Sequence, residues 1–156
     1  MFRRADFARF RRLSGLERLL FLRAVGLLLL IGLGLQLLGF SRVQSVFRQR
    51  ATVPNGRFGP VEAAQRARQT AHLVSAAARH GIYRANCLPT SLALRRLLQG
   101  QGIEANLRVG VRKAGGKLEA HAWVEHQGQP LIDGPDVHER FAAFSEPVHH
   151  GEEAAV

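Results

Sequence analysis

The chain contains a single cysteine, Cys87, which lies where a helix is expected to begin. Leucines at roughly helical spacing follow it, Pro89 suits a first helical turn, and Gly100 or Gly102 provides a stop. Unpaired backbone N–H groups and the positive end of the helix dipole stabilise a thiolate there, and the thiolate is the form that attacks a carbonyl carbon. Cys87 is therefore a candidate nucleophile. The alternative is a buried structural cysteine, because free cysteines are among the most buried residues.

A histidine and an aspartate follow on consecutive predicted strands. If residues 126–128 form a three-residue hairpin loop, His121 lies directly opposite Asp133 on the same face of the sheet. The carboxylate can then hold one imidazole nitrogen while the other points at a thiol. A two-residue loop at Gln127-Gly128 would shift the register and send the two side chains to opposite faces. The loop length thus decides whether Asp133 can orient the imidazole, and Asp136 is the alternative carboxylate.

These residues need two helices and a small sheet to position them. The first predicted helix covers residues 60–80, opens with Pro60, carries a stripe of alanines and is closed by Gly81. A short crossing leads to the helix that begins at Cys87, which gives a helical hairpin. The pattern then changes to period two and predicts three strands, over 105–112, 118–125 and 129–133. This order predicts an α+β fold, with the hairpin packed on a small antiparallel sheet.

Residues near the histidine are candidates for binding a substrate. A Gly115-Gly116 turn pairs Gly110 with His121, which would leave open space beside the imidazole. Trp123 is a second candidate, although a packing role is the simpler interpretation. The remaining histidines are interpreted as solvated or chemically inactive: His72, His80, His126, His138, His149 and His150. No helical or strand spacing brings three of them together, so neither a metal nor a cofactor is expected.

The N-terminal region is basic and apolar. Residues 1–23 alternate arginines with apolar residues in an amphipathic helical pattern, with a break at Ser14-Gly15. Residues 25–40 are apolar all round apart from Gln36, and at ~1.5 Å per residue they reach about 24 Å, short of the ~30 Å hydrocarbon core. No signal-peptide cleavage site is apparent. A buried helix, a partner-docking helix and a membrane-surface helix stay open, and contact with a partner or a membrane is favoured over a span.

Length and charge bound the organisation of the chain. A chain of 156 residues allows one domain plus an extension. We expect four segments: a helical extension over 1–50, a linker over 51–59, a catalytic domain over 60–147 and a tail over 148–156. One cysteine excludes an intrachain disulfide and favours the reducing cytoplasm. The net charge of +10 suits nucleic acid, anionic lipid or an acidic peptide, and charge alone does not choose among them.

Two motifs together carry a family resemblance. Residues 87–98 hold a cysteine-leucine-proline run on the predicted helix, and residues 120–125 read Ala-His-Ala-Trp-Val-Glu on the predicted second strand. With the Pro-Leu-Ile-Asp run at 130–133, they resemble the leader-peptide proteases of lasso-peptide biosynthesis. That family is also described as the C-terminal domain of the microcin J25 processing protein, within the transglutaminase-like superfamily. The resemblance covers about residues 60–145, and the basic, apolar N-terminal region is similar to that of stand-alone members.

The resemblance implies a papain- or transglutaminase-like fold and a Cys-His-Asp cysteine peptidase. Cys87 would be the nucleophile, His121 the general base and later acid, and Asp133 the carboxylate that orients the imidazole. The backbone N–H of Cys87 is the expected oxyanion donor, because it lies at a helix start. Asn86 and Tyr83 are candidates for the second donor.

The implied function is removal of the leader peptide from a ribosomally made lasso-peptide precursor. The expected partners are that precursor, a separate leader-recognition protein and an ATP-dependent macrolactam cyclase, with membrane-surface contact through residues 1–50 and no nucleic acid. Two alternatives stay open: a non-catalytic scaffold of the maturation complex, and an acyltransferase of the transglutaminase type. The active-site residues do not separate hydrolysis from acyl transfer, since both proceed through a thioester.

Overall fold

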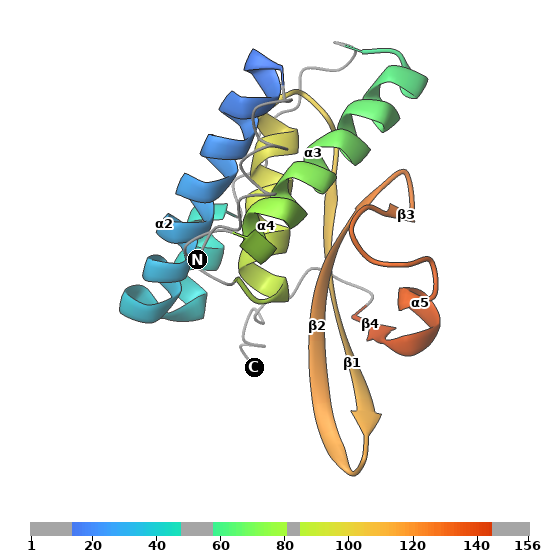
Figure 1. Cartoon of the computed structure of the whole chain (residues 1–156). Helices are drawn as coiled ribbons and strands as arrows, with labels where there is room; N and C mark the ends of the chain where they lie inside the picture. Colours follow the sequence, from blue (N-terminus) through green and yellow to red (C-terminus); the bar gives the residue numbers. More distant parts are fainter. Residues whose placement is uncertain (1–13, 48–57, 81–84, 145–156) are drawn as a thin grey trace, which may run out of the picture.

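A layer of three helices packs against a small, curled antiparallel sheet (Figure 1). The computed structural model describes residues 14–47, 58–80 and 85–144, with residues 38–47 described by their backbone alone. The elements in chain order are α2 (Gly15–Phe47), α3 (Pro60–His80), α4 (Cys87–Gly100), β1 (Asn106–Ala114), β2 (Lys117–His126), β3 (Gln129–Pro130), α5 (Val137–Arg140) and β4 (Ala142–Ala143). The strand order is β3-β2-β1-β4. The predicted α+β class is confirmed, with the cysteine at the start of a helix that packs on the sheet.

Helix α2 begins at the break that the sequence indicated. Ser14 caps it: the backbone N–H of Ser14 donates to Glu17 at 2.7 Å, and the backbone N–H of Glu17 donates to the Ser14 hydroxyl at 3.3 Å. Gln69 of α3 also donates to Glu17, at 2.8 Å. These bonds, the Ser14 backbone bond first, lower the pKa of Glu17 below its usual range. The carboxylate therefore caps the helix start and makes a surface hydrogen bond to α3.

The length of α2 differs from the prediction. The helix continues past residue 40 to Phe47, and its stretch Gly15–Leu37, with 23 residues and a mean hydropathy of 2.1, is long and apolar enough to cross a membrane. The prediction that this segment is too short to span was therefore wrong, because the helix extends beyond residues 25–40 at both ends. The predicted amphipathic pattern over residues 1–13 and most of the linker lie outside the described residues.

One side of α2 belongs to the main hydrophobic core. Ala24, Leu28 and Ile31 are at most 2% exposed and pack with buried residues of α3 and α4. Of the alternatives that the sequence left open, packing against the domain is thus the one observed. The division of the chain into an extension and a catalytic domain stays a prediction, and this side of α2 is continuous with the core of that domain.

Helices α3 and α4 form the predicted hairpin. Helix α3 starts at Pro60 and buries the expected small residues, Ala67, Ala71, Val74 and Ala78. Helix α4 ends in a left-handed turn at Gly102, whose φ is 78°. There the N–H of Ile103 donates to the Leu98 carbonyl at 2.9 Å and the N–H of Gly102 donates to that of Gln99 at 3.0 Å, which satisfies the last helical carbonyls.

Strands β1 and β2 form a long hairpin around Gly115 and Gly116, which both have positive φ. Gly110 pairs with His121, as predicted. Alternate residues of β2 enter different cores. Val124 packs into the helical core, whereas Trp123 packs on the opposite face with Val137 and Phe141 of the α5–β4 segment. His121 has the parity of Trp123 and therefore lies on the face away from the helices.

The second hairpin corrects the predicted register. Its loop is the two-residue turn Gln127-Gly128, with φ of 51° and 75°, so His126 pairs with Gln129 and Glu125 with Pro130. The three-residue loop that would pair His121 with Asp133 is therefore wrong. Strand β3 is also shorter than predicted, because the chain bends away from the sheet after Leu131, whose N–H still donates to the Val124 carbonyl at 3.0 Å. Helix α5 and strand β4 were not predicted, because four-residue and two-residue elements carry no readable periodicity.

Candidate active site

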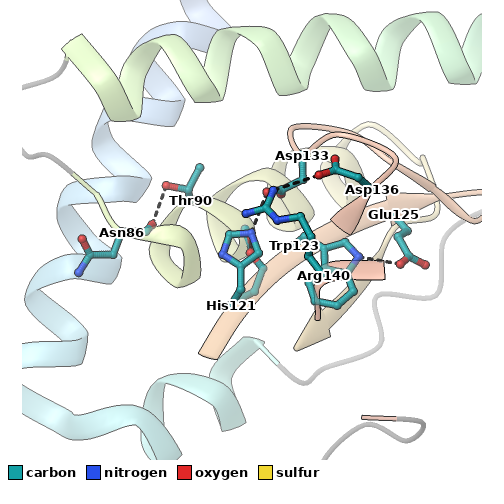
Figure 2. Close-up of polar contacts among 10 residues, drawn as sticks. Asn86, Thr90, His121, Trp123, Glu125, Asp133, Asp136 and Arg140 are labelled. Carbon is teal, nitrogen blue, oxygen red and sulfur yellow. Dashed lines mark hydrogen bonds and ion pairs between the residues drawn. The ribbon is translucent and has the colours of Figure 1, made fainter. Parts of the chain in front are cut away.

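His121 and Asp133 are in contact despite the changed register. His121 Nε2 lies 2.7 Å from Asp133 Oδ1, and since a carboxylate only accepts, the ring nitrogen is the donor (Figure 2). Both side chains are about three-quarters buried. No described residue hydrogen-bonds Nδ1 of His121, so that nitrogen is available to a nucleophile or a substrate. The pair has the arrangement expected of a general base and the carboxylate that orients it.

The short third strand explains this contact. In the observed register, a β3 that continued straight would pair Asp133 with Ala122 and point the two side chains to opposite faces. The strand instead ends at Pro130, and residues 131–133 bend before Gly134 and Pro135. Asp133 is thereby released from the alternation of the strand. Its carboxylate reaches the His121 ring from a loop and not from a paired position.

The edge of β2 that β3 leaves open is occupied by the first turns of α4. Ser91 Oγ donates a 2.9 Å hydrogen bond to the carbonyl of Ala122, the group that an extended β3 would have paired. Ser91 is buried, and Cys87 lies four residues before it on the same side of the helix. This bond therefore holds the N-terminal end of α4 against β2 at the residue next to His121.

Cys87 is the first residue of α4, as predicted, and its thiol is free and half-buried. The structure contains no hydrogen bond between Cys87 and another described residue, so contact between the thiol and His121 stays a prediction. The backbone N–H groups of Cys87 and Leu88 have no intrahelical partner, because they belong to the first helical turn. Pro89 supplies no N–H. The oxyanion donor assigned to the Cys87 backbone thus lies at a free helix end.

Of the two candidates for a second oxyanion donor, Asn86 and Tyr83, the structure describes only Asn86. Asn86 caps α4 through its backbone: its carbonyl accepts from the Thr90 hydroxyl at 2.8 Å, and its side chain makes no capping bond. In Figure 2 the Asn86 amide points away from His121, which disfavours it as a donor in this conformation. Tyr83 lies outside the described residues.

Two aromatic rings flank the imidazole of His121. The Phe141 ring stacks on it with centroids 5.0 Å apart and planes at 29°, and the Trp123 ring lies 6.2 Å away at 16°. Phe141 also contacts two cations, with the guanidinium carbons of Arg112 and Arg140 at 4.9 Å and 5.5 Å from its centroid. Phe141 could not be identified from the sequence, since its position on the histidine depends on the short α5–β4 turn.

Trp123 is held by a buried carboxylate. Its Nε1–H donates to Glu125 Oε1 at 2.7 Å (Figure 2). The other Glu125 oxygen accepts from Arg108 Nε at 3.3 Å. His138 Nε2 lies 3.6 Å from the same Glu125. Trp123 is 0% exposed, which supports the packing interpretation and leaves no surface of it for a substrate. Glu125 was not singled out from the sequence, although a charged residue in the strand motif was a signal.

The open space expected beside Gly110 is absent. A Cβ added to Gly110 would lie 3.0 Å from the Trp123 ring and 3.0 Å from the carbonyl oxygen of Ala142. The position is also buried. The expectation that Gly110 leaves room for a substrate was therefore wrong, because β4 and the indole occupy that room.

The remaining candidates are placed as follows. Asp136 caps α5 and pairs with Arg140 at 3.3 Å, so it is not the carboxylate on His121. His126 is buried and its Nδ1 donates to the Glu104 carbonyl at 2.7 Å, which corrects its interpretation as solvated. His72 and His138 are exposed. His149 and His150 lie outside the described residues, as does the tail over 148–156. Within the described ranges, no three metal-binding side chains come together.

Comparison with known proteins agrees with this architecture. The family model described as "Transglutaminase-like superfamily" matches residues 27–146, which is well over half of the chain. The Microcin J25-processing protein McjB of Escherichia coli is 35% identical over 65 residues, which make up 42% of this chain and 30% of that protein. No solved structure matches the chain significantly. The predicted resemblance to a processing protein of this superfamily is confirmed, and the chain belongs to the transglutaminase-like superfamily.

Proposed function

We propose that this protein is a cysteine endopeptidase that removes the leader peptide from a ribosomally made lasso-peptide precursor. The observation that carries the proposal is the His121–Asp133 pair beside the start of α4, where Ser91 ties the cysteine helix to β2. The similarity to a microcin-processing protein supports the substrate class. The matched segment spans 30% of that relative, so its whole activity is carried over here as part of the proposal.

In the proposed reaction, His121 accepts the thiol proton and Cys87 Sγ attacks the carbonyl carbon at the leader's end. The backbone N–H of Cys87 donates to the oxyanion that forms. The tetrahedral intermediate then collapses, the C–N bond breaks, and His121 returns its proton to the leaving amine. Water, deprotonated by His121, cleaves the thioester and leaves a leader carboxylate and a free thiol. Asp133 holds Nε2 throughout, which keeps Nδ1 directed at the reacting atoms.

Three partners follow from this proposal. The precursor is the substrate, and a separate leader-recognition protein presents it. An ATP-dependent cyclase then joins the freed amine to a side-chain carboxylate. The proposed place of action is the cytoplasm, where a lone thiol stays reduced.

The test is reconstitution with the products of neighbouring genes. The genes expected beside this one encode a short precursor, a small recognition protein and a cyclase resembling asparagine synthetase. The purified proteins are mixed with the precursor and leader release is followed by mass spectrometry. Wild type is expected to cleave when the recognition protein is present, and to cleave poorly without it. Efficient cleavage by the isolated chain at low substrate would contradict the need for that partner.

Active-site variants separate an enzyme from a scaffold. Cys87→Ala and His121→Ala should each reduce cleavage to background with unchanged circular dichroism, because each removes a member of one concerted unit. His72→Ala is the matched control, since it removes an exposed histidine of α3 and should leave cleavage intact. If Cys87→Ala still released the leader, the peptidase would be refuted and a scaffold role favoured.

The same reaction in water labelled with heavy oxygen separates hydrolysis from acyl transfer. Hydrolysis of the thioester places one labelled oxygen in the new carboxylate of the leader. Resolution by an amine would instead yield an unlabelled amide. We expect the labelled carboxylate, and an unlabelled leader amide as the main product would assign the chain as an acyltransferase.

A further inference from the structure

Helix α2 carries a second apolar face that nothing in the described chain covers. Its members share high exposure and no polar atoms in their side chains: Leu19 (46%), Leu22 (58%), Leu30 (68%), Leu33 (54%) and Leu37 (79%). We call these five residues the leucine stripe. Gly26 completes their spacing of three or four residues, and a Cβ added there would meet no atom within 4 Å. The stripe extends over about 27 Å of helix, at ~1.5 Å per residue.

The two faces of α2 are opposite each other. The core-facing residues Ala24, Leu28, Ile31 and Leu35 follow their own spacing of three or four, half a helical turn from the stripe. Between Leu19 and Leu37 the sequence has one charged residue, Arg23. It lies at the border of the stripe and does not interrupt it. The helix is thus apolar on both sides. One side contributes to the core, and the other faces away from it.

The packing of α2 excludes a transmembrane orientation of the folded protein. Leu28, near the middle of the apolar stretch, is 1% exposed and packs in one core with α3 and α4. If that stretch crossed a bilayer, its neighbours would enter the hydrocarbon with it. The exposed face of α3 carries Glu62, Arg66 and Arg68 within three turns, and charged side chains are strongly disfavoured in hydrocarbon. The stripe can meet a bilayer only by lying parallel to its surface.

Charge indicates what kind of surface the stripe meets. The first fifty residues contain ten arginines, no lysine and only two acidic residues, Asp6 and Glu17. The remaining residues are close to neutral, because most of the +10 net charge belongs to this region. Arginines thus bracket the stripe in sequence on both sides, which suits an anionic lipid surface.

We infer that the leucine stripe of α2 docks the protein onto an anionic membrane surface, with the helix lying in the plane of the interface. The leucines enter the boundary between headgroups and acyl chains, and the net positive charge of the first fifty residues favours an anionic lipid surface. Helices α3 and α4, with the sheet that carries His121, then face the aqueous side, because α3 and α4 pack on the opposite face of α2. A protein partner is the competing occupant, and the experiments below separate the two.

The first experiment is vesicle flotation of the purified full-length chain. Vesicles of phosphatidylcholine mixed with phosphatidylglycerol should carry the protein, vesicles of phosphatidylcholine alone should carry less of it, and added salt should weaken binding. The double variant Leu30→Glu/Leu33→Glu should weaken binding by more than about tenfold, because it places two charges in the stripe. Binding that is absent from both vesicle types would overturn the inference.

The matched control is the double variant Val61→Glu/Leu118→Glu. These two side chains are 72% and 74% exposed and lie on α3 and at the tip of the β1–β2 hairpin. The change in net charge equals that of the stripe variant, so unchanged flotation is expected. Equal loss of vesicle binding in both variants would show that binding depends only on net charge, and would refute a role for the leucine stripe. A purified dimer that Leu30→Glu/Leu33→Glu dissociates, with vesicle binding unaffected, would instead assign the stripe to a second copy.

The second experiment distinguishes lying in the interface from spanning. In a Cys87→Ser background, single cysteines at Leu19, Gly26 or Leu37 receive an environment-sensitive dye. Its depth in the vesicles is measured by quenching from nitroxide-labelled lipids. An in-plane helix gives three similar, shallow depths. If the dye at position 26 lay deep while the dyes at positions 19 and 37 lay shallow, and the protein resisted a carbonate wash, the helix would span the bilayer. That result would contradict the in-plane orientation.

Discussion

Asp133 contacts His121 from a loop that follows the short strand β3. This contact was predicted, but from the pairing that a three-residue loop would give. The loop has two residues, and the contact exists because β3 ends early and frees the carboxylate. Residue type and order in the chain were thus predictable. The bend was not, since it accompanies a tertiary contact: Ser91 bonds to the Ala122 carbonyl across 31 residues of sequence.

At this site we predict a large difference between two aspartates. Asp133→Asn should lower the rate of leader cleavage by roughly 10⁴-fold or somewhat less, because an amide holds the imidazole in the wrong tautomer. Asp136→Asn is the matched control and should stay near wild type, since that carboxylate pairs with Arg140 at an exposed helix start. Single-turnover cleavage rates measure both. A greater loss at Asp136 would show that the orienting carboxylate was misassigned.

Gly110 provides a test of the corrected site. Gly110→Ala should destabilise the fold by about 1–3 kcal/mol, because the added methyl group would press on the Trp123 ring and the Ala142 carbonyl. Urea unfolding measures this loss, and KM measured on the folded fraction should be unchanged. Normal stability together with a raised KM would return Gly110 to the substrate site.

At the scale of elements, the start of α4 is the part that the sequence predicted best. Proline in the first turn, the leucine spacing and the glycine stop all act locally, so Cys87 could be placed at the helix start from the sequence alone. The hydrogen bond that ties the start of this helix to β2 could not be predicted, because Ser91 and Ala122 are 31 residues apart in sequence. Helix α5 and strand β4, which bring Phe141 onto His121, are likewise tertiary features.

We predict that Ser91→Ala lowers kcat by more than its loss of unfolding free energy alone would suggest. The variant leaves the Ala122 carbonyl without its partner, which should cost about 1–3 kcal/mol of unfolding free energy. If the first turn of α4 moves by as little as 1 Å, kcat should fall by roughly 10²-fold. Thr90→Ala is the control, because it removes a hydroxyl of the same turn that, among the described residues, bonds only to the Asn86 carbonyl. Equal kcat values for the two variants would show that the β2 anchor does not position Cys87.

At the scale of the whole molecule, α2 is where the sequence was most ambiguous. A helix that is apolar all round fits a core, a partner or a membrane, and periodicity does not separate these when both faces are apolar. The structure assigns one face to the core and leaves the other exposed. Removal of residues 1–50 is therefore expected to uncover α3 and α4, and not to leave an intact catalytic domain.

Two leucines of α2 test this division directly. Leu28→Ala should destabilise the protein by about 2–5 kcal/mol, because it opens a cavity in the shared core. Leu30→Ala should change stability by less than about 0.5 kcal/mol, since that side chain is 68% exposed. Thermal or urea unfolding of the full-length chain compares them. Similar values for the two variants would mean that α2 does not pack as described.

In the proposed reaction, Cys87, served by His121 and Asp133, forms a covalent bond with the leader peptide. The most direct measurement is intact-protein mass spectrometry of reactions quenched in acid during turnover with the precursor and the recognition protein. We predict a mass increase equal to the leader acyl group, mapped by proteolysis to Cys87 and absent from Cys87→Ala. Cleavage that proceeds normally with no adduct on Cys87, and that persists in Cys87→Ala, would contradict the account.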